Sequence, residues 1–129
     1  MQRDRGGNEY ALPGGHVKIG EVMTDSLIRE FMEETGAKIE CLNLLWTEEC
    51  FWEYRGKKVH NITFYYRIAL CPGADIADCG EFVASRDNSD VLLGWTPIEK
   101  IGQMTIYPEF IKQRIHRLNQ PTAHFVTTA

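Results

Sequence analysis

The sequence has no apolar run long enough to span a bilayer, and its first ten residues, MQRDRGGNEY, contain no hydrophobic signal segment. These absences predict a cytoplasmic protein with no membrane partner. A basic stripe is missing too, since the formal net charge is −4. A surface that binds a nucleic-acid duplex needs such a stripe, so this partner is not expected. Small anionic ligands remain compatible with the charge, because a divalent cation can invert the local field.

Zinc-binding and disulfide patterns are also lacking. The four cysteines are Cys41, Cys50, Cys71 and Cys79; none form a C-x-x-C pair, and no histidine lies at zinc-ligand spacing from them. Cys41 and Cys71 lie in apolar stretches, as is typical of reduced, mostly buried thiols. The pattern therefore favours neither a zinc site, nor a disulfide framework, nor a redox function.

The composition is that of an ordinary globular protein, with 43% hydrophobic and 25% charged residues. Its 129 residues suit one domain with a single core, and no repeat, linker or low-complexity tract divides them. We therefore predict one domain over residues 1–129.

A helix is predicted where the loop over residues 15–26 ends. Thr24 is a suitable N-cap and Asp25 is favourable in a first helical turn, whereas Gly36 is a natural residue just past a helix end. Between them runs one apolar stripe at helical spacing, made of Leu27, Ile28, Phe31 and Met32. The stripe predicts that one side of the helix packs on the core.

Two strand-like runs follow, over residues 39–54 and 58–70, and the second is rich in β-branched and aromatic residues. Residues 55–57, RGK, predict a hairpin turn between them. A long polar connection leads to a short strand in residues 91–97, and residues 107–118 predict an amphipathic helix. This order of elements indicates a layered α/β or α+β domain.

Three glutamates crowd the predicted helix within the stretch REFMEETG: Glu30, Glu33 and Glu34. At about 100° per residue they share one face, opposite the apolar stripe. One interpretation is a solvated helix face, on which Arg29 pairs with Glu33 at i,i+4. The other is a metal site, because Mg²⁺ prefers oxygen ligands.

Two features favour the metal site. Glu30 and Glu34 are like charges at i,i+4, which destabilises an isolated helix by a few tenths of a kcal/mol. A further carboxylate, Glu21, and the glycine pair Gly14–Gly15 precede the helix across a loop. Glycine lets a backbone approach a ligand closely, so an open turn beside three carboxylates supplies the oxygen ligands that Mg²⁺ prefers.

Residues 15–37 read GHVKIGEVMTDSLIREFMEETGA, which resembles the box motif of the Nudix family, G-x5-E-x7-R-E-U-x-E-E-x-G-U, where U is a bulky aliphatic residue. All seven fixed positions are matched, by Gly15, Glu21, Arg29, Glu30, Glu33, Glu34 and Gly36. Phe31 and Ala37 depart from the usual U residues but keep both positions apolar. The preceding YALPGG and the later VLLGWTPIEKI resemble the family more loosely, over nearly the whole chain.

The resemblance implies the α/β (α+β) Nudix fold, a mixed β-sheet sandwiched between α-helices. Family members usually have a further strand or two before the lead-in, whereas only MQRDRGGNE precedes YALPGG here. This apparently short N-terminus has two explanations: the chain is a fragment or its start is assigned late, or something else covers the open sheet edge. In the second case we predict a homodimer, with strand exchange as one way to form it.

The resemblance also implies a reaction, the hydrolysis of a nucleoside diphosphate linked to another group X, with one to three Mg²⁺ or Mn²⁺ ions. Such ions neutralise charge on the pyrophosphate and make a water nucleophilic. Carried over by position, the metal ligands are Glu30, Glu33, Glu34 and a backbone carbonyl of Gly14 or Gly15.

Catalytic roles follow from the same resemblance. One box glutamate, with Glu33 and Glu30 as the candidates, would take the proton from the attacking water. Arg29 would orient a glutamate, and Glu21 would support the loop or bind a metal through water. The base sometimes lies outside the box in this family. Acids of the polar connection are then the candidates, namely Glu81, Asp87 and Asp90, each of which is otherwise a solvated loop acid.

Substrate-binding residues are predicted on both sides of the box. Arg3 and Arg5 lie where the family often has arginines near substrate phosphates, although exposed strand ends would explain them equally. Tyr54 stands near the spacing associated with diadenosine polyphosphate hydrolases, and Asp90 is a further candidate contact. Aromatic residues after the box could stack on a base, or pack the core or a dimer face.

Two other functions stay open for such a sequence. A non-catalytic Nudix domain that senses a nucleotide is the main alternative, although no box glutamate is lost. An isomerase or glycosidase on the same scaffold would need further catalytic residues, which the sequence does not identify.

Overall fold

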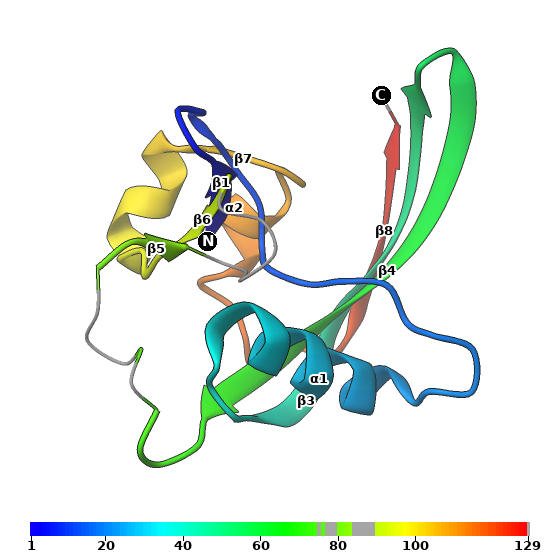
Figure 1. Cartoon of the computed structure of the whole chain (residues 1–129). Helices are drawn as coiled ribbons and strands as arrows, with labels where there is room; N and C mark the ends of the chain where they lie inside the picture. Colours follow the sequence, from blue (N-terminus) through cyan, green and yellow to red (C-terminus); the bar gives the residue numbers. More distant parts are fainter. Residues whose placement is uncertain (75, 77–79, 84–89, 129) are drawn as a thin grey trace.

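The computed structural model of the chain describes residues 1–74, 76, 80–83 and 90–128. Within this part, the strands form three sheets, and one long helix, α1 (Met23–Thr35), packs against the largest of them (Figure 1). Parallel and antiparallel pairs both occur, so the predicted α+β class with mixed strand pairing is confirmed. No helix of the described residues is long and apolar enough to cross a membrane.

The largest sheet has the order β4-β3-β8 and is built on a long hairpin. β3 (Ile39–Tyr54) pairs antiparallel with β4 (Lys57–Leu70) and parallel with β8 (Ala123–Thr128). Arg55 and Gly56 form the turn with φ of 49° and 78°, and positive φ at both central residues is the geometry of tight hairpin turns. The predicted hairpin is therefore confirmed, whereas β8 was not predicted.

Two smaller sheets lie on the other side of the molecule. One has the order β1 (Gln2–Asp4), β6 (Val91–Leu93) and β5 (Phe82–Val83), all antiparallel. The other is a parallel pair of β2 (Glu9–Tyr10) and β7 (Thr105–Ile106). The N-terminal residues thus form two short strands that the sequence did not predict.

Helix α1 ends as predicted but begins differently. Gly36 has a φ of 74° and its N–H donates to the carbonyl of Met32, which confirms it as the helix-ending residue. The predicted N-cap at Thr24 is wrong, because the helix already begins at Met23 and Val22 precedes it with no side-chain cap. The buried Ser26 ties this end of the helix to the loop instead, through a hydroxyl that donates to the carbonyl of His16 at 3.5 Å.

The C-terminal helix is much shorter than predicted. A 3₁₀ helix, η1 (Ile98–Gln103), precedes β7, and α2 covers only Ile111–Arg114 instead of residues 107–118. The flanking turns close by i→i−3 hydrogen bonds, for example from Arg117 N–H to the carbonyl of Arg114, so no continuous α-helix forms. The predicted apolar side nevertheless packs on the core, through Phe110, Ile111, Ile115 and Leu118.

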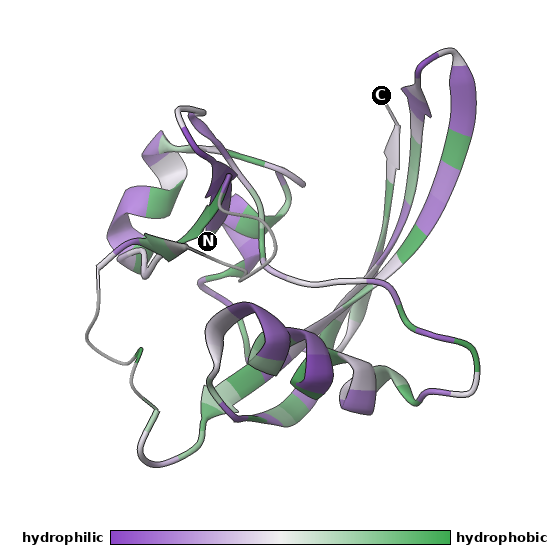
Figure 2. Cartoon of the chain, viewed as in Figure 1, coloured by the Kyte–Doolittle hydropathy of each residue, from purple (hydrophilic) through white to green (hydrophobic). Residues whose placement is uncertain are grey.

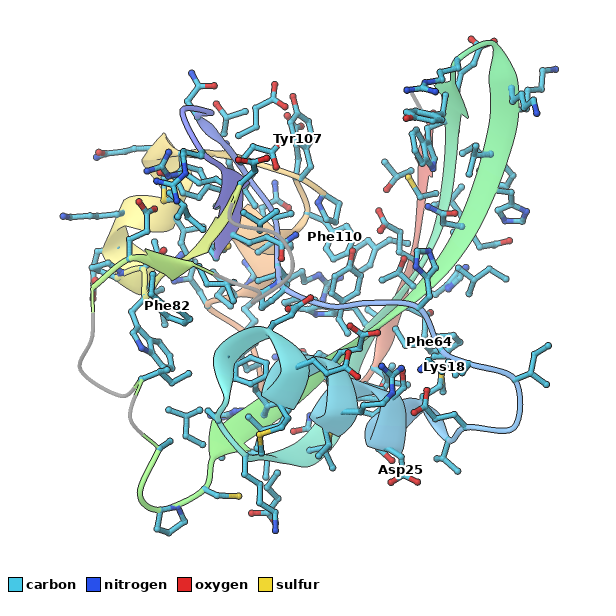
Figure 3. The ribbon with its side chains drawn as sticks, in the orientation of Figure 1. Lys18, Asp25, Phe64, Phe82, Tyr107 and Phe110 are labelled. Carbon is cyan, nitrogen blue, oxygen red and sulfur yellow. The ribbon has the colours of Figure 1, made fainter. Side chains whose placement is uncertain are left out.

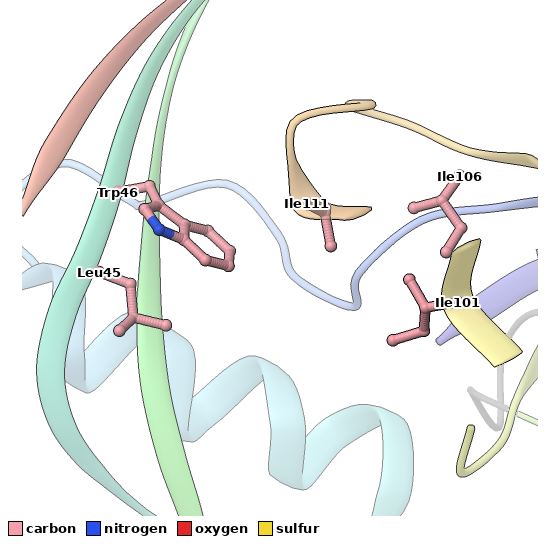
Figure 4. Packing of buried hydrophobic residues seen from close by; sticks show 5 residues of the cluster. All are labelled: Leu45, Trp46, Ile101, Ile106 and Ile111. Carbon is pink, nitrogen blue, oxygen red and sulfur yellow. The ribbon is translucent and has the colours of Figure 1, made fainter. Parts of the chain in front are cut away.

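Two buried clusters join these elements. Leu45 and Trp46 of β3 face Ile101, Ile106 and Ile111 of the other half of the molecule (Figure 4). The second cluster joins α1 to the lower part of the hairpin, and its buried members are Phe31, Ala37, Ile39 and Ile76. Figure 2 shows the matching pattern on α1, whose hydrophilic residues lie on one side and hydrophobic residues on the other.

Candidate active site

Gly15 brings the loop before α1 against a glutamate of the helix. A Cβ atom added at Gly15 would lie 2.6 and 2.7 Å from the carboxylate oxygens of Glu30, so only glycine allows this approach. The neighbouring Gly14 meets nothing within 4 Å and is exposed. The structure thus places a loop backbone and a helix carboxylate side by side, as a shared ion site requires.

Arg29 is the centre of the charged network on this face of α1. Its guanidinium binds Glu21 through two hydrogen bonds, from Nε at 2.8 Å and from Nη2 at 3.0 Å. Its remaining terminal nitrogen, Nη1, donates to Glu30 at 3.1 Å and to Glu33 at 3.2 Å. One guanidinium therefore holds three carboxylates, which explains how the helix tolerates so many acids.

The network shifts the pKa values of its members in opposite directions. Hydrogen bonds donated by Arg29 lower the pKa of Glu21 to about 2, and the same hydrogen bonds raise the pKa of Arg29 above its usual range. The Glu21 carboxylate is thus fixed in its ionised form beside the loop.

Glu34 stands apart from this network. It is only partly exposed, and the described residues offer it no hydrogen bond or ion pair. Burial raises its pKa to about 7, and the nearby charges of Glu30 and Glu33 add to the rise. A carboxylate that is both desolvated and crowded by two others is stabilised by a nearby cation.

The oxygen atoms of the box glutamates and of the glycine backbone suit a hard divalent cation. The glutamate side chains, however, do not surround a position for one. Glutamate oxygens beside an open glycine backbone are the ligands that Mg²⁺ and Mn²⁺ prefer. Yet within the described residues no three His, Cys, Asp or Glu side chains converge closely enough to hold a metal. The reason is visible in the contacts, because Glu30 and Glu33 are turned toward Arg29.

The predicted substrate residue Arg3 is already paired. Its guanidinium binds Glu81 through Nε at 2.8 Å and Nη2 at 2.5 Å, and it also donates to the carbonyl of Gly7. The pair lowers the pKa of Glu81, which was a candidate general base. The structure thus brings two sequence candidates together, as partners of each other.

The remaining sequence candidates in the N-terminal segment and the polar connection are Arg5, Asp87 and Asp90. The backbone N–H of Arg5 donates to the carbonyl of Asp90 at 2.6 Å, at the end of the β1–β6 ladder. Asp90 is exposed, and Asp87 lies outside the described residues.

Tyr54 is not brought to the box residues at all. It is the last residue of β3, at the tip of the hairpin, which projects away from α1 (Figure 1). Its ring is 53% exposed and contacts Trp52, with the Arg55 guanidinium 5.2 Å from the ring centroid. Its predicted role in substrate binding would therefore require a ligand that spans both regions.

Two neighbouring glutamates of β3 form networks that the sequence analysis missed. Glu48 is only 3% exposed and accepts hydrogen bonds from Tyr65 at 2.9 Å and from Thr127 at 2.6 Å. Burial, followed by the charge of Glu48, raises the pKa of the Tyr65 hydroxyl. Alternation along the strand could have assigned Glu48 to the inner face, although the Thr127 partner is 79 residues away.

On the opposite face of the same strand, Glu49 binds two histidines. It lies 3.0 Å from His124 Nε2 and 3.3 Å from His60 Nε2, and these contacts lower its pKa. The two glutamates together hold β8 to β3 from both faces of the sheet.

Two hollows border the smaller sheets, and only the first of them is also lined by residues of α1. The first, of about 190 Å³, is apolar and touches the box region through Pro13 and Phe31. The second, of about 450 Å³, is more polar and is lined by residues that include Tyr10, Glu81 and Lys100. Trp95 borders both hollows, and its indole N–H donates to the carbonyl of Ile76 at 2.6 Å. Figure 3 shows how side chains from the separate elements crowd the centre of the molecule around Phe110.

Comparison with known proteins identifies a domain type that covers most of the chain. Residues 1–118 match the family model described as "NUDIX domain". A protein of Mycobacterium tuberculosis (strain CDC 1551 / Oshkosh), whose name reads "Putative mutator protein MutT4", is 28% identical over 105 residues. That similarity covers 81% of this chain and 39% of the relative, so the chain spans about two fifths of that protein's length.

Proposed function

The chain belongs to the Nudix family, and from that premise we propose that it hydrolyses a pyrophosphate bond in a nucleoside diphosphate linked to a group X. The proposed cofactor is Mg²⁺ or Mn²⁺. The observation that carries the proposal is Glu34, a carboxylate with no hydrogen bond or ion pair among the described residues, whose pKa is raised to about 7 by burial and by the charges of Glu30 and Glu33. A self-repelling acidic cluster beside the close backbone of Gly15 is the arrangement that a cation relieves.

The proposed metal ligands are Glu30, Glu33, Glu34 and a carbonyl of Gly14 or Gly15. A bound divalent cation would neutralise charge on the pyrophosphate and lower the pKa of a bound water. The carboxylates must be ionised to bind it, and Glu34 is the one that has to lose a proton near neutral pH.

The roles of the other box residues follow from their contacts. Glu21 holds the guanidinium of Arg29 by two hydrogen bonds, and Arg29 in turn holds Glu30 and Glu33. We assign Arg29 as a positioning residue and Glu21 as its support. Glu33 is 56% exposed and is the most accessible partner of Arg29, which suits it to accept a proton from the attacking water.

A panel assay tests the proposed reaction. The protein is incubated with dNTPs, ADP-ribose, diadenosine polyphosphates and nucleotide sugars with Mg²⁺ or Mn²⁺, and phosphate is measured with and without an added phosphatase. The expected result is turnover of at least one class that disappears with EDTA. Turnover that persists in EDTA would contradict the metal requirement.

The Glu33→Gln variant tests the site assignment. It removes one charge with little change in shape, so metal-dependent turnover should fall by about 10²-fold or more while the melting temperature stays close to that of the wild type. Glu40→Gln is the matched control, because Glu40 is an exposed glutamate on β3. Equal rates for both variants would refute the assignment.

A nucleotide-sensing domain without catalysis is the second candidate. It is favoured by one observation, that Glu30 and Glu33 are held by Arg29 and that no three acids among the described residues converge on a metal position. This reading predicts nucleotide binding by calorimetry with no turnover of any compound in the panel.

A further inference from the structure

Among the residues that the structure describes, the edge strand β4 has a long backbone edge with no pairing partner. In the described part of the chain, β4 pairs only with β3, although it runs for 14 residues. β8, at the other edge of the same sheet, has six residues. An edge of this length presents a row of N–H and C=O groups to which a further strand can bind.

The side chains of β4 do little to prevent such pairing. The segment Val59–Tyr66 contains no charged residue, no proline and no glycine, and it is rich in β-branched and aromatic residues. The positive charges of β4 lie on either side of this segment, at Lys57, Lys58 and Arg67. Strand edges that stay unpaired usually carry a charge in the middle or a bulge. Between Val59 and Tyr65 the strand carries no charge and its register with β3 is regular; the register shifts against β3 begin only at Tyr65–Tyr66.

Exposed apolar side chains lie beside this edge. Ile62 is 61% exposed and Phe64 is 40% exposed, and both lie on the face of the sheet that carries Glu49 and Thr47. Figure 2 shows hydrophobic bands along β4 where it rises away from α1, and Figure 3 places Phe64 on this part of the strand. Such side chains gain from burial against a partner strand.

We infer that two copies of this chain pair antiparallel through β4, so that two three-stranded sheets become one sheet of six strands. The partner is a second copy because an identical antiparallel edge is self-complementary about a two-fold axis. An axis at Thr63 places Ile62 opposite Phe64 of the partner subunit and sets no two like charges directly opposite each other. If the axis passed through Ile62 instead, Lys57 of one copy would lie directly opposite Arg67 of the other. Two like charges in that position are unfavourable.

The mass in solution gives the first test. The wild-type chain should have twice the 14.8 kDa mass of one copy in analytical ultracentrifugation. Ile62→Lys places two symmetry-related charges in the interface and should weaken the dimer by roughly tenfold or more. Val126→Lys is the control, because Val126 is 60% exposed on the same face but belongs to β8. A monomeric wild type overturns the inference, and so does equal weakening by the two variants.

A cross-link tests the register and does not depend on the folding of a charged variant. In the proposed pairing, Thr63 faces its own copy, so Thr63→Cys should form an intermolecular disulfide under mild oxidation. Asn61→Cys is the control, because its copy lies four residues along the strand, about 13 Å away. Wild-type chain treated in parallel accounts for its native cysteines. A disulfide dimer for Thr63→Cys alone supports the inference. No cross-link, or equal cross-linking of both variants, overturns it.

Discussion

At the scale of single residues, Gly15 is the position where one added carbon changes the candidate site most. In Gly15→Ala the new methyl group would press on the carboxylate of Glu30 and push it from the loop. We expect the affinity for Mn²⁺ to fall by about tenfold or more, as for other changes that displace a metal ligand. Electron paramagnetic resonance of free Mn²⁺ during a titration measures this directly.

Gly14→Ala is the control for this change. A Cβ at Gly14 meets nothing within 4 Å, so Mn²⁺ affinity should stay within about twofold of wild type. If Gly14→Ala loses as much affinity as Gly15→Ala, the close approach of loop and helix does not define the site.

Glu34 gives a prediction about pH. Its pKa in the folded protein is raised to about 7 from the ordinary glutamate value of 4.5, so folding favours the protonated form. The stability that this group contributes is therefore full below about pH 4.5 and is lost as the pH rises through about 7. Because Glu34→Gln cannot ionise, metal-free variant and wild type should melt at similar temperatures at pH 5.

At pH 8 the same variant should be the more stable protein. The free energy of unfolding should be higher by about 1 kcal/mol. This is less than the full pKa shift would give, because the side chain is partly exposed to solvent. Thermal melts in EDTA at the two pH values measure the difference, with Glu40→Gln as a variant that should show no such pH dependence. A variant less stable than wild type at pH 8 would mean that Glu34 makes a favourable contact as an ion.

At the scale of elements, β8 depends on side chains of β3 as well as on backbone pairing. Thr127→Val keeps the shape of the side chain but removes the hydroxyl that donates to the buried Glu48. Leaving a buried carboxylate oxygen without this donor should cost about 1–3 kcal/mol of unfolding free energy. Hydrogen exchange should show the loss first in the amides of β8, because this strand is at the edge of its sheet.

The neighbouring Thr128 provides the matched control. It is exposed on the opposite face of β8, and Thr128→Val should change the unfolding free energy by no more than about 0.5 kcal/mol. Equal protection of the β8 amides in the two variants would show that Glu48 does not hold the strand.

Elements with a strong local signal were predicted, and elements defined by distant partners were missed. The β3–β4 hairpin has long β-branched and aromatic runs around a turn with a glycine, and α1 has an apolar stripe and an end at Gly36. β1 and β8 have no comparable pattern, because each exists through a partner strand more than 70 residues away in the chain. Contacts with distant parts of the chain also explain why α2 is shorter than predicted. Its apolar residues are held in place by packing on the core, so they do not need a long continuous α-helix.

The candidate site divides in the same way. Gly15, Glu21, Arg29 and Glu30 lie within 16 positions of the chain, so spacing alone could group them, and the structure brings them into contact. The pairing of Arg3 with Glu81 joins residues 78 positions apart and could not be read from local spacing. Their assignment to substrate and to catalysis stays a prediction, now with the added fact that each neutralises the other.

At the scale of the whole molecule, one apolar cluster connects the large sheet to the half that carries the smaller sheets. Trp46 of β3 packs with Phe110 at a ring-centroid distance of 5.6 Å, and Ile111 beside it is fully buried (Figure 4). The candidate active site takes its loop, helix and flanking strands from both halves of the molecule. The two halves must therefore keep a fixed relative position for the site to stay intact. Because the cluster joins the two halves, we expect them to unfold as one unit.

Ile111→Ala tests this coupling. The change leaves a cavity in the cluster and should cost about 2–4 kcal/mol of unfolding free energy. Unfolding should still be a single transition, with the same midpoint by tryptophan fluorescence, which reports on Trp46, Trp52 and Trp95, and by far-ultraviolet circular dichroism, which reports on the whole backbone. Ile98→Ala is the control, because Ile98 is 45% exposed at the start of η1 and should cost less than about 1 kcal/mol. If the two signals separate in Ile111→Ala but not in Ile98→Ala, the halves are independently stable units that the cluster merely docks.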